Sequence, residues 1–307
     1  MNEHLAGKNI AVTGAGNGIG RGIALACAAE GANVVVADYG VSLDGLDPSS
    51  EVADAVVVEI EAAGGTAIAV AGDVSKMEVG QQVVDTAVDN WGSIDGVVCV
   101  AGIVRERMLF NMSEEEFDDV VAVHLKGHFT LYRAASAVMR KQETGGSLVG
   151  FTSGAFVAST AQPNYSAAKG GVVSLTRSAA FALRRYGINA NCIAPTAMTR
   201  MAENVPFEIE AGAPEDIAPL AVYLLSDAAR DITAQTYTCT GSRIAVWNQP
   251  VEVREMVAYT DGVFTVDEIA ERLPVSVGQE EMPMFADLER RMKEMAEKKA
   301  AEEAAAP

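Results

Sequence analysis

The chain has 307 residues, of which 49% are hydrophobic and 21% are charged, a composition typical of a globular protein with a large core. It carries 23 Lys and Arg against 42 Asp and Glu, a formal net charge of −19, which argues against DNA, RNA or an anionic membrane surface as its main partner. Its start has no basic-then-apolar leader, and no apolar run approaches the roughly 20 residues of a membrane helix, so we expect a cytoplasmic protein.

Short apolar runs alternate with helical stretches from the start of the chain to about residue 242. This alternation is typical of a parallel sheet covered by helices on both faces. The predicted strands are residues 9–13, 33–38, 66–71, 94–100, 147–151, 189–194 and 235–240. We therefore expect an α/β fold with a doubly wound parallel sheet, the Rossmann fold, over residues 1–243. A C-terminal helical extension is expected over residues 244–307.

Two helix starts and one late helix stand out along the chain. Ser75 with Glu78, and Ser113 with Glu116, have the spacing of a capping box, in which two side chains bind free N–H groups at a helix start. Residues 284–299 place apolar side chains at helical spacing and predict an amphipathic helix. We expect this helix to dock on its own or a neighbouring subunit, because two heptads are too few for a coiled coil.

The sequence does not indicate a metal site. The cysteines lie far apart in apolar segments, a pattern of buried, reduced thiols in a cytosolic protein; they are Cys27, Cys99, Cys192 and Cys239. His124 and His128 have the i, i+4 spacing of metal ligands, but no third ligand lies near them in the sequence. We therefore expect no bound metal.

A glycine-rich segment, TGAGNGIG, lies between the first predicted strand and the helix after it. Glycines at this place let the backbone approach a pyrophosphate, whose charge then lies at the helix N-terminus. Standing alone, such a segment is also compatible with a simple tight turn. Its candidate cofactor-binding residues are Thr13, Gly14, Asn17, Gly18, Ile19 and Gly20.

Asp38 closes the second predicted strand, 18 residues after Gly20. At this position a carboxylate accepts hydrogen bonds from the ribose 2′-hydroxyl of a dinucleotide. It would repel a 2′-phosphate, and neither Asn17 nor Tyr39 supplies a compensating cation. The sequence therefore favours NAD over NADP as the cofactor.

A second motif places Tyr165 and Lys169 on one helix face, with Ser153 twelve residues before the tyrosine. Lowering a phenol pKa from about 10 to about 7 takes roughly 4 kcal/mol of phenolate stabilisation. A nearby ammonium in a partly dry site supplies energies of this order. For this pair alone, an exposed tyrosine and lysine would be the simpler interpretation. The glycine loop, Asp38 and Ser153 occur, however, in the order that an active site needs.

Together these residues resemble the short-chain dehydrogenase/reductase family over about residues 5–243. The resemblance implies that Tyr165 is the general acid/base, that Lys169 binds the nicotinamide ribose and tunes Tyr165, and that Ser153 orients the substrate oxygen. It also implies a homotetramer. Further cofactor contacts implied by the resemblance are Asp73, Val74, Ala101, Gly102, Pro195 and Thr199.

Residues 102–129 and 164–201 carry a closer resemblance. They look like the (3R)-hydroxyacyl-CoA dehydrogenase part of the peroxisomal multifunctional β-oxidation enzyme, also called 17β-hydroxysteroid dehydrogenase type 4. This resemblance implies a role in lipid or steroid metabolism. It fixes the class of substrate less firmly than it fixes the fold.

Three positions depart from the usual family pattern. Cys99 and Val100 stand where many members have two asparagines, so a strand-to-helix hydrogen bond must be replaced or absent. His124 stands where the family has an asparagine that holds a proton-relay water, so the relay is altered and His124 is a candidate catalytic residue. The spacing from Ser153 to Tyr165 is one residue short, so an ungapped alignment would give the role of the serine to Thr152.

The sequence thus predicts an NAD-dependent oxidoreductase that interconverts a secondary alcohol and a ketone on a fairly apolar small molecule, such as a 3-hydroxyacyl thioester or a hydroxysteroid. The alternative is a dinucleotide-binding, redox-responsive protein without efficient turnover, suggested by the changes at residues 99–100. Retention of Tyr165 and Lys169 argues against it. Helices at about residues 115–141 and 164–185 are expected to form one interface of the homotetramer.

Overall fold

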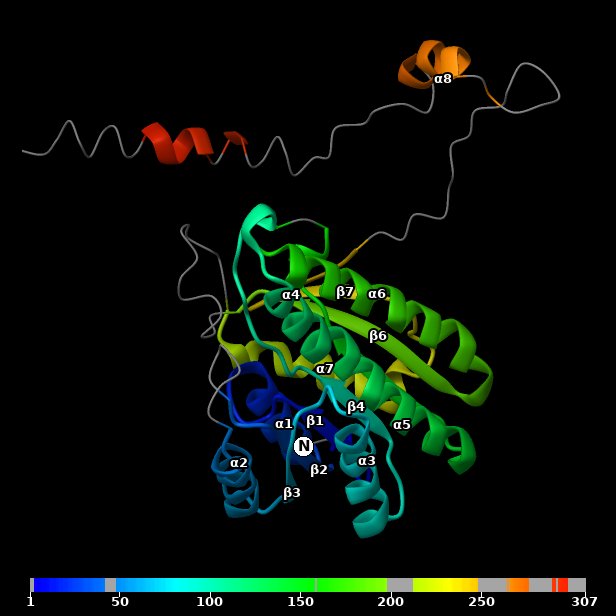
Figure 1. The fold of residues 1–307 in the computed structure, drawn as a ribbon. Coiled ribbons are helices and arrows are strands. Elements are labelled where there is room, and N and C mark those ends of the chain that lie inside the picture. The colour runs from blue at the N-terminus through cyan, green and yellow to red at the C-terminus, as the bar shows by residue number, and fades with distance from the viewer. Residues whose placement is uncertain are drawn as a thin grey trace, which may run out of the picture. The chain divides into compact units, whose positions relative to one another are not determined.

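The computed structural model describes residues 3–41, 48–157, 159–197, 212–247, 264, 266–275, 289–290 and 292–297. Contacts within the chain divide it into two compact units, Met1–Trp247 and Asn248–Pro307. The first unit contains a sheet with helices on both sides (Figure 1).

The described strands form one eight-stranded sheet in the order β3-β2-β1-β4-β5-β6-β7-β8. The first seven pair in parallel, and β8 pairs antiparallel with β7. Their bounds are β1 Asn9–Thr13, β2 Asn33–Asp38, β3 Thr66–Ala71, β4 Gly96–Cys99, β5 Gly146–Phe151, β6 Ile188–Pro195, β7 Thr236–Thr240 and β8 Arg243–Val246. The doubly wound parallel sheet that the sequence predicted is therefore confirmed.

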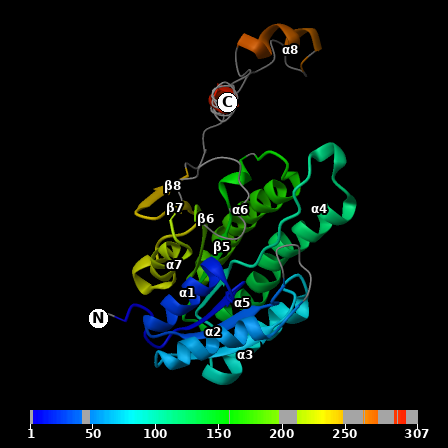
Figure 2. The ribbon, with the colours of Figure 1, turned by 90° about the vertical axis from the view of Figure 1, so that its left-hand side faces the viewer.

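Helices lie on both faces of this sheet (Figure 2), and a separate hydrophobic cluster packs against each face. Helices α1, α2 and α7 contribute to one cluster, and α3, α5 and α6 contribute to the other. The bounds are α1 Gly18–Ala29, α2 Glu51–Ala62, α3 Met77–Trp91, α4 Glu114–Val121, α5 Gly127–Gln142, α6 Pro163–Leu183 and α7 Ala218–Leu225.

Strand β2 shows why both faces must be apolar. Successive side chains of a strand point to opposite faces. Val34 and Val36 accordingly lie in the first cluster, and Val35 and Ala37 lie in the second. A strand buried on both sides reads as one continuous apolar run, which is why the sequence identified it.

Strand β8 is a finding that the sequence did not predict. It follows β7 after a tight turn in which Gly241 has a φ of +48°. All four of its residues are exposed, and Ile244 alternates with charged or small neighbours. The long apolar run that marks the central strands is therefore missing.

Only one of the two predicted capping boxes is present. Ser113 accepts the Glu116 N–H at 3.1 Å and Glu116 accepts the Ser113 N–H at 2.9 Å, which starts α4. The prediction at Ser75 is wrong, because α3 begins at Met77 after Lys76, which makes no side-chain cap. The Ser75 N–H instead binds the Asp73 carboxylate at 2.9 Å, so the Asp73 loop ends before the helix begins.

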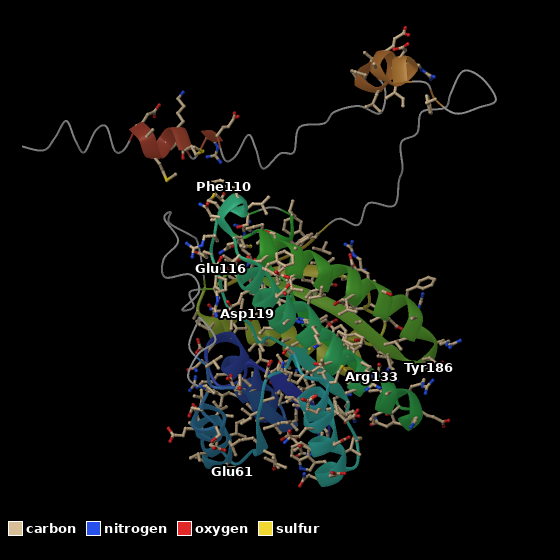
Figure 3. The ribbon with its side chains drawn as sticks, in the orientation of Figure 1. Glu61, Phe110, Glu116, Asp119, Arg133 and Tyr186 are labelled. Carbon is tan, nitrogen blue, oxygen red and sulfur yellow. The ribbon has the colours of Figure 1, made fainter. Side chains whose placement is uncertain are left out.

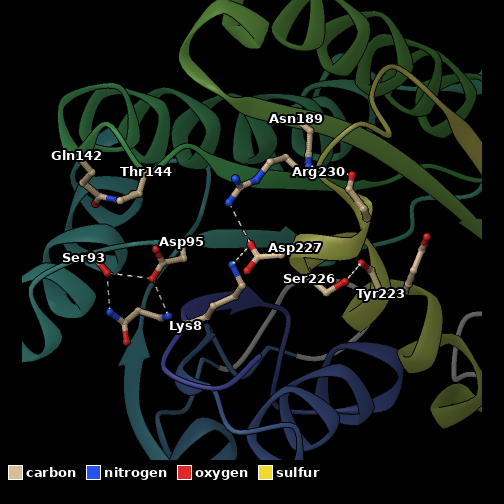
Figure 4. A network of polar contacts seen from close by, with 12 residues as sticks. Lys8, Ser93, Asp95, Gln142, Thr144, Asn189, Tyr223, Ser226, Asp227 and Arg230 are labelled. Atoms are coloured by element: carbon tan, nitrogen blue, oxygen red, sulfur yellow. Dashed lines mark hydrogen bonds and ion pairs between the residues drawn. The ribbon is translucent and has the colours of Figure 1, made fainter. Parts of the chain in front are cut away.

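A network of polar side chains lies at the amino ends of the strands (Figure 4). Asp227 accepts from Lys8 at 2.9 Å and from Arg230 at 3.3 Å. Asp95 accepts from the Ser93 hydroxyl and from the Asn9 N–H, both at 2.9 Å. Exposed ion pairs of this kind contribute about 0–1 kcal/mol each, so we assign the network a structural role.

All four cysteines are free and buried, as the sequence predicted. Over the described part of the chain, no helix is both long and apolar enough to cross a membrane. Within that same part, no group of three or more His, Cys, Asp or Glu side chains is placed to hold a metal ion.

The second unit contains helix α8, Val266–Arg272, and a following 3₁₀ turn, Leu273–Val275. Residues 289–290 and 292–297 are also helical, within the amphipathic helix predicted at 284–299. The rest of that predicted helix lies outside the described residues. Its docking on a subunit stays a prediction.

Candidate active site

A cleft of about 420 Å³ lies along the carboxyl ends of strands β1 to β6. In an open parallel sheet this edge, where the strand order reverses between β1 and β4, is the usual place for a ligand. Thr199 lies outside the described residues. The predicted site residues that line the cleft are Gly14, Asn17, Gly18, Ile19, Gly20, Asp38, Asp73, Val74, Ala101, Gly102, His124, Tyr165, Lys169 and Pro195.

The glycine-rich loop brings free backbone N–H groups to this cleft. Gly14 has a φ of +66°, and a Cβ there would lie 2.7 Å from the Ala101 backbone, so only glycine fits. Asn17 makes no side-chain cap on α1, and the first turn carries no acidic residue. The N-terminus of α1 therefore keeps its unsatisfied N–H groups and partial positive charge available to a phosphate.

Asp38 lines the cleft together with the glycine-rich loop. Its two carboxylate oxygens accept the N–H groups of Gly16 and Gly40, each at 2.7 Å. Each oxygen has further acceptor capacity. No Lys or Arg stands between Arg21 and Lys76 in the sequence, and the Arg21 guanidinium is paired with Glu59 at 2.6 Å. This part of the cleft therefore suits a hydroxyl donor better than a phosphate.

Thr13 lies beneath the cleft and does not line it. Its Oγ1 accepts the N–H groups of Val100 at 3.2 Å and Ala101 at 3.5 Å, and the residue is 3% exposed. The predicted contact with a cofactor does not fit this geometry, because the hydroxyl is used by the backbone after β4. Thr13 thus ties the end of β1 to the backbone that follows β4.

Tyr165 and Lys169 lie one turn apart near the start of α6, with the Lys169 Nζ 5.4 Å from the centre of the Tyr165 ring. The Tyr165 phenol is hydrogen-bonded to the Ser153 hydroxyl. Lys169 is 3% exposed, and its Nζ donates to the Phe151 carbonyl at 2.6 Å. The structure therefore brings the three predicted residues together at the ends of β5 and α6.

The structure also distinguishes Ser153 from Thr152. The Thr152 Oγ1 donates to the Lys169 carbonyl at 2.9 Å and is buried against α6. Ser153, one residue later, turns its hydroxyl to Tyr165 and accepts the Ala155 N–H at 3.2 Å. Of the two hydroxyls, that of Ser153 is thus the one turned to Tyr165, although the spacing alone gave the role to Thr152, which lines the cleft.

Burial controls the ionisation of the central pair. It raises the pKa of Tyr165, and the hydrogen bond from Ser153 offsets this only in part. Burial also lowers the pKa of Lys169 to about 7. The lowered tyrosine pKa that the sequence led us to expect is thus not found, because desolvation outweighs the favourable contacts of the phenolate.

His124 completes the wall around Tyr165. It lies in a π-helical turn, Ala122–Lys126, that joins α4 to α5; such turns are frequent at functional sites. The His124 Nε2 lies 2.8 Å from the Ile103 carbonyl, and the ring meets Tyr165 edge-on with centroids 5.0 Å apart. A Cβ on Gly102 would lie 2.2 Å from the His124 ring, so this packing requires glycine.

His124 is neutral and keeps one free acceptor. Burial, aided by the Lys169 charge, holds its pKa well below the usual range. Because its Nε2 donates to a carbonyl, its Nδ1 carries the lone pair. Within the described residues this Nδ1 is buried without a partner, as expected of an atom that serves a ligand or a bound water.

The buried histidines predict acid sensitivity. Burial lowers the pKa of His128 to about 3, so the folded protein keeps it neutral while the unfolded chain gains a proton below about pH 6.5. The unfolded state then binds more protons, and stability falls as the pH falls from about 6.5 towards 3. Urea unfolding between about pH 7 and 5 measures this slope. His128→Gln is expected to flatten it, and an unchanged slope would contradict the assignment.

Two charged residues lie at the rim of the cleft. Arg105 and Asp119, the latter labelled in Figure 3, line the cleft and form a loose ion pair at 3.5 Å. The Asn164 side chain donates to the Arg105 carbonyl at 3.0 Å, which holds this loop at the start of α6. Only folding brings residues 105, 119 and 164 to one rim, so no local motif marked them.

Comparison with known proteins adds independent evidence. The family model described as Enoyl-(Acyl carrier protein) reductase matches residues 14–241. Hydroxyacyl-CoA dehydrogenase ChsB1 of Mycobacterium tuberculosis is 42% identical over 262 residues, which are 80% of this chain and 81% of that protein. Peroxisomal multifunctional enzyme type 2 of Mus musculus is 41% identical over 227 residues, 73% of this chain and 30% of that much longer protein.

Two solved structures extend this likeness to three dimensions. A short chain dehydrogenase from Mycobacterium avium is 43% identical with a TM-score of 0.81, and the match covers 91% of this chain and 97% of that chain. A short chain dehydrogenase from Mycobacterium paratuberculosis bound to NAD is 26% identical with a TM-score of 0.71, and the match covers 78% and 98%. The family model, the Mycobacterium tuberculosis relative and the Mycobacterium avium structure are all named as dehydrogenases or reductases.

Proposed function

Because the chain belongs to the short-chain dehydrogenase/reductase family, we propose that it is an NAD-dependent oxidoreductase that interconverts a secondary alcohol and a ketone. The observation that carries this proposal is the placement of Tyr165, Lys169 and the free N-terminus of α1 along one cleft. Residues 1–243 would form the catalytic domain and residues 244–307 an extension.

The residues along the cleft fit a nicotinamide dinucleotide. The N-terminus of α1 would hold the pyrophosphate, Asp38 the adenosine ribose, and Lys169 the nicotinamide ribose. When bound, this cofactor supplies the carbon that accepts or returns a hydride. The remaining proposed contacts are Gly14, Asn17, Gly18, Ile19, Gly20, Asp73, Val74, Ala101, Gly102, Tyr165, Pro195 and Thr199.

The protein side chains would handle the proton and the substrate oxygen. Tyr165 accepts the hydroxyl proton of the alcohol during oxidation and returns it to the carbonyl oxygen during reduction. Ser153 holds the same oxygen, and the Lys169 ammonium stabilises the phenolate form of Tyr165. His124, neutral and with a free Nδ1, is placed to hold a water next to this group.

Cofactor preference follows from Asp38. We expect NAD to be preferred over NADP, because the carboxylate accepts from ribose hydroxyls and repels a 2′-phosphate. Asp38→Asn keeps an acceptor oxygen and removes the charge, so it should narrow the preference by about tenfold, given roughly 1.5–3 kcal/mol for a hydrogen bond to a charged group. The measurement is kcat/KM for both cofactors, with the exposed Asp54→Asn as control. A parent protein that prefers NADP would refute this assignment.

The substrate is proposed to be a 3-hydroxyacyl thioester of coenzyme A. The relatives include a hydroxyacyl-CoA dehydrogenase, and the cleft has apolar walls that suit an acyl chain, formed by Val41, Ile103 and Val123. A hydroxysteroid is the second candidate, since the same walls suit an alicyclic alcohol. Initial rates on 3-hydroxyacyl-CoA, hydroxysteroid and small aromatic alcohols, with NAD and NADP in parallel, separate these classes.

A dinucleotide-binding protein without efficient turnover is the alternative of a different class. Titration with NADH and the same substrate panel distinguish the two. Binding of NADH together with turnover of at least one alcohol supports the enzyme. Binding with no turnover on any member of the panel supports the alternative.

The proposed enzyme is expected to be a homotetramer. Helices α5 and α6 expose large apolar side chains, with Phe129 44% and Phe181 92% exposed, as helices do at an unsatisfied interface. We expect Phe181→Glu to reduce the molar mass measured by light scattering. Val58→Glu, at an exposed position of α2, should leave the molar mass unchanged. A full-length monomer would show that these helices form no such interface.

A further inference from the structure

His128, in α5, is a buried histidine outside the group of residues proposed to react. It is 1% exposed. Its Nδ1 lies 2.5 Å from the His124 carbonyl oxygen, and its Nε2 lies 3.1 Å from the Phe151 backbone nitrogen. Burial lowers the pKa of His128 to about 3, so the ring is neutral, and it bridges the π-helical turn to the end of β5.

The Phe151 N–H lies where the neighbouring strand β4 ends. Cys99, the last residue of β4, pairs with Gly150, so the Cys99 carbonyl faces the Phe151 N–H at the end of the ladder. The His128 Nε2 contacts the same N–H, and its ring also meets the Cys99 backbone. Gly150 leaves the space for it, since a Cβ there would lie 3.3 Å from the His128 ring and 2.6 Å from the Tyr132 hydroxyl.

The carbonyl of the same residue holds the lysine. The Phe151 oxygen accepts from the Lys169 Nζ at 2.6 Å, and it is the one hydrogen-bond acceptor that the described residues give this ammonium. The N–H of the following residue, Thr152, donates to the Ile193 carbonyl of β6 at 2.8 Å. The backbone on either side of Phe151 is thus held, by β4 together with His128 at its N–H and by β6 after it.

We propose that His128 is a positioning residue of this site: by fixing the Phe151 backbone, it sets the carbonyl that holds the Lys169 ammonium beside Tyr165. The inference rests on the proposed function for the role of Lys169 in turnover. The chain of contacts itself, from His128 through Phe151 to Lys169, does not depend on which alcohol is oxidised.

The test compares two substitutions of His128 with one matched control. His128→Leu removes both hydrogen bonds, whereas His128→Gln keeps one donor and one acceptor. Tyr132→Phe is the control: it breaks the bond to the Thr176 hydroxyl at 3.1 Å in the same buried layer and leaves Phe151 untouched. Circular dichroism checks the fold of each variant. His128→Ser replaces the leucine variant if that variant does not fold.

The first readout needs no substrate. Trace acetylation of the ligand-free protein with acetic anhydride, followed over pH by peptide mass spectrometry, reports the pKa of Lys169. In His128→Leu the Phe151 backbone loses one of its contacts, the carbonyl holds the ammonium less firmly, and the labelling curve should move to lower pH by about half a unit or more. His128→Gln should stay near the parent, and Tyr132→Phe should match it.

The second readout is turnover. We expect kcat of His128→Leu to fall by about tenfold or more, because misplacing a reacting group by 1 Å costs up to about 10²-fold. The KM for NAD should stay within about threefold, and His128→Gln should recover most of the loss. If the labelling curves of His128→Leu and Tyr132→Phe coincide with the parent, the inference is wrong. A parent without turnover refutes the proposed function, while the labelling curves still decide the role of His128.

Discussion

Tyr165→Phe is expected to lower turnover by at least about two orders of magnitude, the lower end of the contribution of a general acid or base. The substitution removes the phenolic oxygen that is hydrogen-bonded to Ser153 and keeps the ring that packs edge-on against His124. Affinity for NADH should therefore stay within about threefold. Steady-state kinetics and NADH titration give the two quantities separately.

Tyr223→Phe is the matched control, since Tyr223 lies on α7, is 45% exposed and does not line the cleft. Its kinetics should equal those of the parent. A Tyr165→Phe protein with turnover within a few-fold of the parent would remove Tyr165 from the mechanism.

Ser153→Ala and Thr152→Ala belong in the same assay. The larger loss is expected for Ser153→Ala, because the Thr152 hydroxyl is bound to the Lys169 carbonyl.

Lys169→Met should abolish most turnover and at the same time stabilise the ligand-free protein. Burial lowers the pKa of Lys169 to about 7 from a usual value near 10.5. Between these two pH values the unfolded chain binds a proton that the folded chain does not, so stability rises with pH across this window. The full penalty of the buried ammonium is present below about pH 7, and it disappears as the pH approaches about 10.5.

Methionine fills the same space without a charge, so the gain in stability should be largest below about pH 7 and should shrink as the pH rises. Urea unfolding at several pH values measures the gain, and NADH titration should show weaker binding, unlike Tyr165→Phe. Lys141→Met, on an exposed position of α5, is the control. A Lys169→Met protein that is less stable than the parent below pH 7, or that keeps its turnover, would contradict this account.

The sheet and the cleft were predictable because they depend on local patterns. Strands buried on both faces read as apolar runs, and β1, β2 and β3 have the bounds predicted from the sequence. The glycine loop and Asp38 follow strand ends, so the fold alone brings them to one edge. The comparisons also confirm the predicted family and its likeness to hydroxyacyl-CoA dehydrogenases.

The remaining features depend on contacts that no local pattern encodes. Which hydroxyl faces Tyr165, that of Thr152 or that of Ser153, is decided by their bonds to α6 and to the turn after β5. The Val100 N–H and the Phe151 N–H contact side chains from distant parts of the chain, Thr13 and His128. The carbonyl that binds the Lys169 ammonium belongs to the backbone of Phe151. Every residue has such a carbonyl, so the residue type at position 151 could not predict this contact.

We propose that a carbinol hydrogen of a secondary alcohol passes to NAD in this cleft while Tyr165 takes the hydroxyl proton. This transfer can be followed with 3-hydroxyacyl-CoA deuterated at its carbinol carbon and mass spectrometry of the reduced dinucleotide. We expect deuterium in the NADH formed by the parent protein and almost none formed by Tyr165→Phe in the same time. A parent protein that binds NADH yet transfers no label from this thioester or from any other alcohol of the panel would contradict it.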